Sequence, residues 1–234
     1  MHRKGAQDKK RAKIFAKIAR EILVAAKIGP DPEMNPRLRA VLQNCRAANM
    51  PKDNVERAIK KATDKDTSDF KEVNFEGYAP HGIAVFVETA TDNNNRTVAN
   101  VRSHFNKCNG NLGTSGSVEF MFDQVCFFKI KSEGQDAEEL ELELIDFGAE
   151  EIGLDEDALV ITGTFESFGQ LQSKLEGDGM EILESGLERI PNITKELGAE
   201  ETAEVEKLIE RLEEDDDVQN VFHTMSSATD DSEA

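Results

Sequence analysis

The sequence is poor in cysteine and in aromatic side chains other than phenylalanine. Its three cysteines, Cys45, Cys108 and Cys126, are an odd number without CxxC spacing, so neither a disulfide framework nor a zinc ribbon is encoded. With no tryptophan and one tyrosine, single-strand binding by base stacking is a poor expectation. No apolar run approaches the length of a transmembrane helix, and the basic start lacks the apolar segment of a signal peptide. We therefore expect a protein of the reducing cytoplasm that does not contact a membrane.

Motifs of catalysis are also absent from the sequence. No GxSxG, HExxH, P-loop or GxGxxG pattern occurs, and His81, His104 and His223 are scattered. We expect no catalytic residue, no cofactor and no small-molecule substrate. His104 and Cys108 lie four residues apart on a predicted helix, which is half of a metal site, but no second half is evident. We therefore expect His104 and Cys108 to be a partly buried pair, and we predict no metal site.

The sequence does have an uneven distribution of charge. It contains 28 lysines and arginines against 47 aspartates and glutamates, a net charge of −19. Residues 1–61 carry 16 basic and 6 acidic side chains, whereas residues 62–234 carry 12 basic and 41 acidic ones. This asymmetry indicates that one module meets a polyanion while the acidic remainder repels indiscriminate contact. The alternative is a basic surface whose charges are simply solvated.

Helical periodicity dominates the basic segment. Lys9–Lys27 predicts a helix, Asn35 followed by Pro36 predicts the start of a second, and Pro51 opens a third, so three short helices form a bundle. The polar stretch 63–69 predicts a linker. The inner face of the first helix is expected to consist of Ile14, Phe15, Ile18, Ile22 and Ala25.

The basic residues of this bundle are the candidate nucleic-acid contacts. At about 100° per residue, the lysines and arginines of the first helix fall opposite its apolar face. Contacts of this kind neutralise phosphates and release counterions, but no helix-turn-helix signature identifies a helix that reads bases. The candidates are Arg3, Lys4, Lys9, Lys13, Lys17, Arg20, Arg37, Arg39, Lys52, Arg57, Lys60 and Lys61.

The remainder of the chain predicts an α/β organisation. A strand over Ile83–Glu88, a helix from Asn93 to Gly110, and strands at Val118–Phe122 and Cys126–Lys131 form a β-α-β-β unit. A helix and a strand near the end of the chain complete a ferredoxin-like layer, and short strands and helices between them form an inserted domain. This sheet lacks the Lys/Arg-Gly-aromatic signature of RNA-recognition domains.

We therefore predict an α+β protein: an N-terminal three-helix bundle followed by two small α/β domains, one ferredoxin-like and discontinuous with the other inserted into it. The expected divisions are residues 1–69 for the basic helical bundle, 70–132 plus 193–225 for the ferredoxin-like domain, 133–192 for the inserted domain, and 226–234 for a disordered tail.

Two polar loops are candidates for anion or partner binding. Asn93, Asn94, Asn95, Arg96 and Thr97 stand where a strand meets a helix start, and helix capping is the competing and favoured interpretation. The segment 113–117, Gly-Thr-Ser-Gly-Ser, could form a backbone nest for an anion, although a structural turn is the stronger expectation because it lacks the Gly-Lys-Ser/Thr ending of a P-loop.

Several long segments resemble the YebC family. They are His2–Phe15, Asn35-Pro-Arg-Leu-Arg, the stretch from Ala47-Ala-Asn-Met-Pro to Lys61, Phe75-Glu-Gly-Tyr, Thr91-Asp-Asn-Asn-Asn-Arg-Thr and Gly116-Ser-Val-Glu-Phe-Met-Phe. The family pattern has a further basic, aromatic stretch before the position of His2, so either the start of this sequence is misassigned or that arm is missing. A glycine-rich family loop is replaced by Ala79-Pro-His-Gly.

The resemblance implies a three-domain regulator of gene expression, but it does not distinguish regulation of transcription from regulation of translation. Members are usually described as DNA-binding transcriptional regulators, and some, including the mitochondrial translational activator of cytochrome oxidase, act at the ribosome. Duplex DNA and ribosomal RNA therefore both remain expected partners. The acidic remainder of the chain slightly favours the ribosome, since it would limit wrapping of duplex DNA. A third alternative is a module that binds only proteins.

Overall fold

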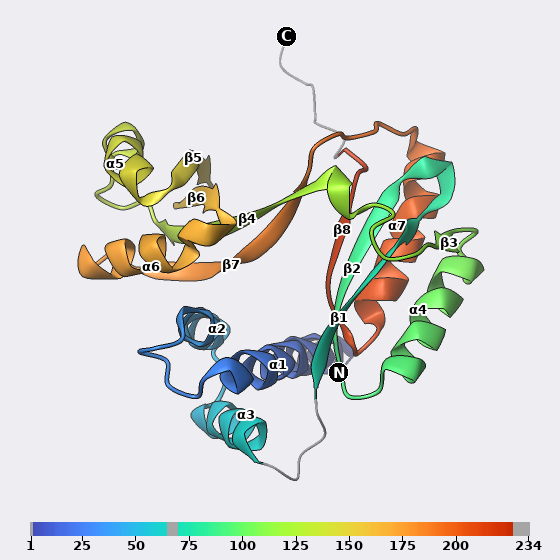
Figure 1. The fold of residues 1–234 in the computed structure, drawn as a ribbon, viewed down its shortest axis with the longest axis horizontal. Helices are drawn as coiled ribbons and strands as arrows, with labels where there is room; N and C mark the ends of the chain where they lie inside the picture. Colours follow the sequence, from blue (N-terminus) through green and yellow to red (C-terminus); the bar gives the residue numbers. More distant parts are fainter. Residues whose placement is uncertain (1, 65–69, 227–234) are drawn as a thin grey trace. The chain divides into compact units, whose positions relative to one another are not determined.

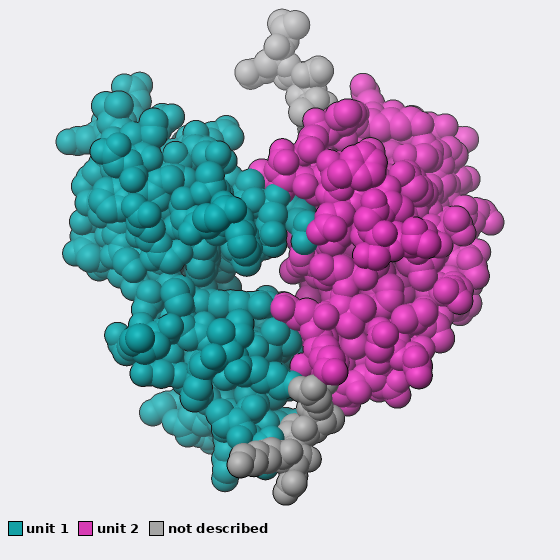
Figure 2. Space-filling view, viewed as in Figure 1, with its two compact units in different colours: residues 1–68, 124–189 teal, residues 69–123, 190–234 magenta. Residues whose placement is uncertain are grey.

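The structure is a computed structural model that describes residues 2–64 and 70–226, with side chains from residue 11 onward. The chain divides into two units, Met1–Ser68 with Gln124–Arg189 and Asp69–Asp123 with Ile190–Ala234 (Figure 2). Most of the predicted linker, residues 65–69, and all but the first residue of the predicted disordered tail lie outside the described residues.

The first unit begins with the three predicted helices, α1 (His2–Ile28), α2 (Pro36–Ala47) and α3 (Lys52–Thr63) (Figure 1). Asn35 explains the connection between α1 and α2. Its side-chain oxygen accepts a hydrogen bond from the Leu38 amide at 3.0 Å, which caps α2, and its amide group donates to the carbonyls of Ala25 and Gly29, both at 2.8 Å. One buried side chain thus satisfies backbone groups at two helix ends.

Among the side chains that the structure describes, the bundle core includes residues from the second half of α1. Ile22, Ala25 and Ala26 pack against α2 and α3, with Ile18 partly buried beside them. The inward placement of Ile14 is wrong, because its side chain is 51% exposed. At 1.5 Å per residue the 27-residue α1 is about 40 Å long, so it extends well past the short partners that bury its apolar face.

The first unit also contains a four-stranded sheet in the order β5-β6-β4-β7. Its strands are β4 (Phe122–Lys131), β5 (Ala149–Asp155), β6 (Ala158–Thr164) and β7 (Ile182–Pro191). Two helices, α5 (Ala137–Leu144) and α6 (Phe168–Gly177), share a core with the sheet. From β4 the core residues are Cys126, Phe128 and Ile130.

The predicted strand at Val118–Phe122 is wrong. Residues Glu119–Met121 form a short 3-10 helix, and β4 then runs without interruption from Phe122 to Lys131. Apolar alternation at 118, 120 and 122 is typical of a strand, but Phe120 is 71% exposed, while Val118 and Phe122 are buried together against the other sheet.

The assignment of Cys126–Lys131 to the first predicted sheet is also wrong, because β4 pairs with β6 from Val125 opposite Thr164 to Lys131 opposite Ala158.

The second unit is built on the antiparallel sheet β3-β1-β2-β8. Its strands are β1 (Lys71–Tyr78), β2 (Ala84–Thr91), β3 (Asn111–Leu112) and β8 (Val218–His223). Helices α4 (Asn94–Lys107) and α7 (Ala199–Glu214) pack on one face of this sheet (Figure 1). Strand β1 is absent from the predicted elements, because its apolar alternation consists of Val73 and Phe75 alone before Gly77.

The predicted fold class is confirmed: the protein is α+β, with an N-terminal helical region followed by two small antiparallel sheets and their helices. In the part of the chain that the structure describes, no helix combines the length and the apolar character needed to span a bilayer.

Candidate nucleic-acid interface

The basic stripe of α1 is partly covered. Lys13, Lys17 and Arg20 follow one another at spacings of four and three, and all three are half-buried. One guanidinium nitrogen of Arg20 is shielded from solvent, and the neighbouring Leu23 and Val24 are 6% and 9% exposed. The predicted candidates Arg3, Lys4 and Lys9 lie on the α1 backbone, but their side chains are outside the described part.

Helix α3 carries four exposed cations. Val55, Ala58 and Ile59 turn inward to the core, which leaves the charged positions on the opposite side. Lys52 lies 3.5 Å from the Glu56 carboxylate one turn on, an exposed pair worth little to stability. The exposed cations are Lys52, Arg57, Lys60 and Lys61.

The cations of α2 differ from one another. Arg37 is half-buried. Arg39 holds α2 against α6 of the same unit: its Nε lies 3.3 Å from Glu176 Oε2. Gln43 of α2 donates to Glu176 at 2.7 Å as well. Arg39 thus serves a structural contact, and its charge is largely balanced within the unit.

Three described cations outside the predicted set, Arg11, Lys27 and Arg46, are also exposed on the bundle. Arg11 is exposed, stacks over the Phe15 ring at 5.3 Å from its centroid, and reaches the Asn49 carbonyl at 3.4 Å. Arg46, near the end of α2, is exposed too. Arg11 falls off the predicted stripe by helical position, so only its place beside the loop between α2 and α3 identifies it.

The loop at Asn93–Thr97 has the structure of a helix cap. Asn93 caps α4 by accepting from the Arg96 amide at 3.1 Å. Arg96 binds both carboxylate oxygens of the buried Asp217, at 2.9 and 3.0 Å, and Asp92 at 2.9 Å. These hydrogen bonds, Asp217 first, raise the pKa of the guanidinium. The network joins the start of α4 to the start of β8, and Asn94 and Asn95 remain exposed beside it.

Backbone amides of Gly116, Val118 and Glu119, at the end of the 113–117 loop and just after it, form a nest whose anion is internal. The buried Glu76 carboxylate accepts from the amides of Gly116 at 2.6 Å, Val118 at 2.7 Å and Glu119 at 2.8 Å. Three donors aimed at one carboxylate are the arrangement by which such nests hold anions. Because β1 supplies that carboxylate, the loop is closed to an outside ligand.

His104 and Cys108 do not form a site with each other. The His104 Nε2 lies 3.0 Å from the Asp215 carboxylate, while Cys108 is buried in the core of the same unit. Among the described residues there is no group of three or more histidine, cysteine, aspartate or glutamate side chains that could hold a metal ion.

An N-terminal helical region followed by two small sheets defines a class of α+β protein that is represented among solved structures. The crystal structure of a conserved hypothetical protein from Aquifex aeolicus is similar with a TM-score of 0.83 and 40% sequence identity, and the match covers 94% of this chain and 91% of that one.

Comparison of the sequence defines the family. Residues 1–65 match the "TACO1/YebC protein N-terminal domain" and residues 70–225 match the "TACO1/YebC second and third domain". The chain belongs to the TACO1/YebC family.

Relatives within this family are similar over nearly their whole length. A protein of Flavobacterium johnsoniae is 65% identical over 227 residues, covering 95% of this chain and 96% of that protein, and one of Myxococcus xanthus is 49% identical over 227 residues, covering 94% and 95%. Both are named "Probable transcriptional regulatory protein". These names support a regulatory role.

Proposed function

We propose that this protein is a non-enzymatic, cytoplasmic regulator of gene expression that binds nucleic acid through its N-terminal helical bundle, with duplex DNA as the first candidate partner. One observation carries the proposal. The bundle segment 1–61 has 16 basic and 6 acidic side chains, and the rest of the chain is strongly acidic.

The exposed cations of the bundle suit backbone contact. Lys52, Lys60 and Arg57 on α3 are exposed to solvent, and lysine and arginine side chains are among the groups that make hydrogen bonds to phosphates. Such contacts fix position on a polyanion without reading sequence. The transcriptional names of the relatives favour duplex DNA as that polyanion.

Ribosomal RNA is the second candidate, and the charge of the remaining chain favours it. Residues 62–234 carry 12 basic and 41 acidic side chains, which repel a duplex that wraps around the protein. On a ribosome the same acidic surface can face basic ribosomal proteins. A translation factor would use the bundle for RNA and the acidic units for positioning.

Crosslinking in cells distinguishes the candidates. The tagged protein is crosslinked with ultraviolet light in its own cells, and the attached DNA and RNA are sequenced. The comparison is a bundle variant, Lys52→Glu with Lys60→Glu, and a matched control in the acidic second unit, Lys71→Glu with Lys207→Glu; all four positions are exposed.

Each outcome has a definite meaning. Enrichment of a few promoter fragments that the bundle variant loses and the control keeps supports the transcriptional regulator. Ribosomal RNA recovered at a confined site, with the same dependence on the bundle, supports the translation factor. Recovery of neither nucleic acid above background overturns the proposed function.

A further inference from the structure

One stretch of the acidic second unit has no acidic residue. Residues 93–118, which comprise α4 and the loops at its two ends, contain no aspartate or glutamate, although residues 62–234 hold 41 of them. The contrast is clearest between the two helices that pack on the same sheet. Helix α7 carries seven glutamates in 16 residues, whereas α4 carries none in 14. Helix α4 and its flanking loops are therefore an acid-free segment within an otherwise acidic part of the chain.

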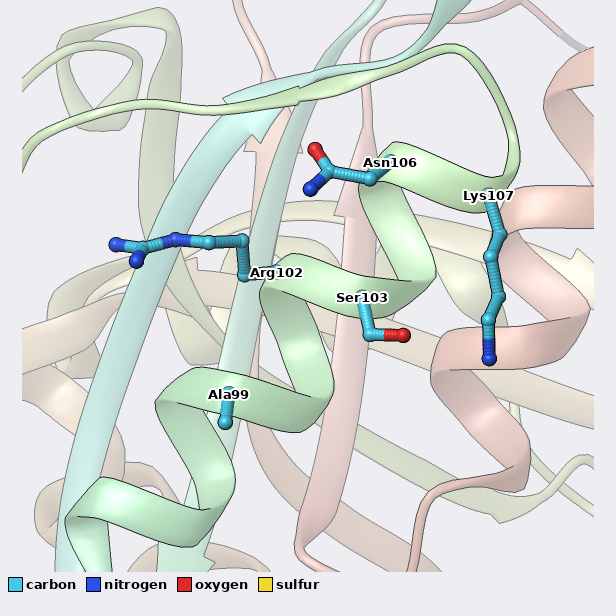
Figure 3. A pocket seen from close by; sticks show the side chains of 5 residues that line it. All are labelled: Ala99, Arg102, Ser103, Asn106 and Lys107. Carbon is cyan, nitrogen blue, oxygen red and sulfur yellow. The ribbon is translucent and has the colours of Figure 1, made fainter.

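The outer face of α4 is exposed and nearly flat. Ala99, Arg102, Ser103, Asn106 and Lys107 line a shallow hollow of about 450 Å³ (Figure 3). Arg102 extends to one side of Ser103 and Lys107 to the other, so the two cations flank a surface of small polar groups (Figure 3). A small residue at Ala99 keeps the floor of this hollow low. We name these five residues the α4 face.

The basic side chains of α4 fall into two sets. Arg96 and His104 each lie within hydrogen-bond distance of a carboxylate near the start of β8, so they hold the fold together. Arg102 and Lys107 have neither a hydrogen bond nor an ion pair to any residue in the described part of the chain. Their charges are thus left for solvent or for a ligand.

The sequence also leaves these cations without helical neighbours of opposite charge. Pairs four residues apart on a helix are the simplest way to balance an exposed cation. The positions four residues from Arg102 are Val98 and Asn106, and the position four residues before Lys107 is Ser103. In a chain this rich in glutamate, uncharged residues occupy the positions where acidic partners would be expected.

This surface has the chemistry of a contact with a nucleic-acid backbone. Arginine, lysine, asparagine and serine side chains are the groups that bind phosphate and sugar oxygens. An acid-free area also removes the repulsion that the rest of the unit exerts on a polyanion. Asn94 and Asn95, exposed at the start of α4, extend the same neutral polar character along the helix.

We propose that the α4 face is a second nucleic-acid contact site, which binds the phosphate backbone of the same nucleic acid that the bundle holds. The inference rests on the proposed nucleic-acid binding of the bundle and adds a contact in the other unit. Two linked contacts on one polymer raise its affinity and the number of phosphates neutralised.

Binding titrations of the purified full-length protein test this site. The probes are an RNA duplex and a DNA duplex of the same sequence, titrated over a series of salt concentrations. Four proteins are compared: the wild type, the bundle variant, Arg102→Glu with Lys107→Glu, and the control Lys71→Glu with Lys207→Glu. The control changes net charge equally. Circular dichroism and thermal unfolding verify that each variant is folded.

The expected result is a loss of affinity and a smaller salt slope in the α4 variant. Losing two phosphate contacts reduces the slope of log affinity against log salt by about 2, since each contact accounts for about 1. The neutral variant Arg102→Gln with Lys107→Gln should show most of this loss, while the control keeps the wild-type slope.

Two results would overturn the inference, and they differ in what else they overturn. If the bundle variant loses binding while the α4 variant behaves like the control on both duplexes, the second site does not exist and the proposed function stands. If the wild type binds neither duplex, the proposed function fails and the second site fails with it.

Discussion

Glu76 gives the sharpest prediction about stability, because its buried carboxylate accepts three backbone amides at 2.6 to 2.8 Å. In Glu76→Gln, an amide oxygen at the Oε2 position keeps the two bonds from Val118 and Glu119, while the amide nitrogen faces the Gly116 N–H. One bond to a charged acceptor is lost and one donor is left unpaired, which amounts to about 2 kcal/mol. Glu76→Ala removes all three acceptor contacts, and we expect it to lose about 4 kcal/mol.

Urea unfolding followed by circular dichroism measures these losses. The midpoint should fall in the order wild type, Glu76→Gln, Glu76→Ala, with an unchanged dependence on urea, because the surface exposed on unfolding is the same. Asp123→Asn, at an exposed carboxylate nearby in the sequence, is the control and should stay within about 0.5 kcal/mol of wild type. Equal midpoints for Glu76→Gln and the control would refute the idea that this carboxylate organises the loop.

Three further predictions follow from buried polar groups. Asn35→Ala should lower the unfolding free energy by about 2 to 3 kcal/mol, since it removes a helix cap and two other hydrogen bonds; a loss typical of a surface substitution in the same urea assay would contradict this. Burial raises the pKa of the Cys45 and Cys126 thiols to about 11, and Cys108 is 5% exposed. A thiol reagent should therefore label none of the three cysteines at pH 8 until the protein unfolds. Rapid labelling of the native protein would count against the buried placement of these thiols. Burial lowers the pKa of His223 below its ordinary 6.5, so below that pH the unfolded chain binds a proton more readily than the folded chain does. The contribution of His223 to the free energy of unfolding should be full above pH 6.5 and decline as the pH falls below it. In urea unfolding measured at several pH values, His223→Gln, which cannot titrate, should flatten that decline.

The helices could be predicted from the sequence because their signals are local. Asn35 and Pro36 mark the start of α2 within two residues, and the structure places the cap there. Ile14 is the exception, since helical spacing assigns it inward while α2 and α3 are too short to cover it. Periodicity predicts the face of the helix on which a side chain lies. Burial of that side chain also requires another element that packs against the same turn of the helix.

The sheets were harder to predict because strand pairing is not local. In β4, Phe128 is buried beneath helices that come later in the chain, so no neighbouring residue reveals which sheet the strand joins. Strand β1 could not be predicted because its apolar alternation is limited to Val73 and Phe75 before Gly77. The burial of Glu76 depends on the amides of a loop some 40 positions away.

The candidate interface shows the same division between what is local and what is distant. Counting charges identified the basic bundle, and helical spacing identified the exposed lysines of α3 such as Lys52 and Lys60. The contact of Arg39 with Glu176 joins residues far apart in the sequence, so neither the charge count nor the helical spacing could predict it. The α4 face was overlooked for another reason, since its signal is the absence of acidic residues.

The salt dependence of nucleic-acid binding by the purified bundle variant tests the central claim most directly. Lys52→Glu with Lys60→Glu should weaken binding to duplex DNA and to ribosomal RNA fragments alike, and should lower the slope of log affinity against log salt by about 2. The matched control, Lys71→Glu with Lys207→Glu, should keep the wild-type slope. Equal slopes and affinities for the two variants would contradict the account, because the exposed cations of the bundle would then make no contact with phosphate.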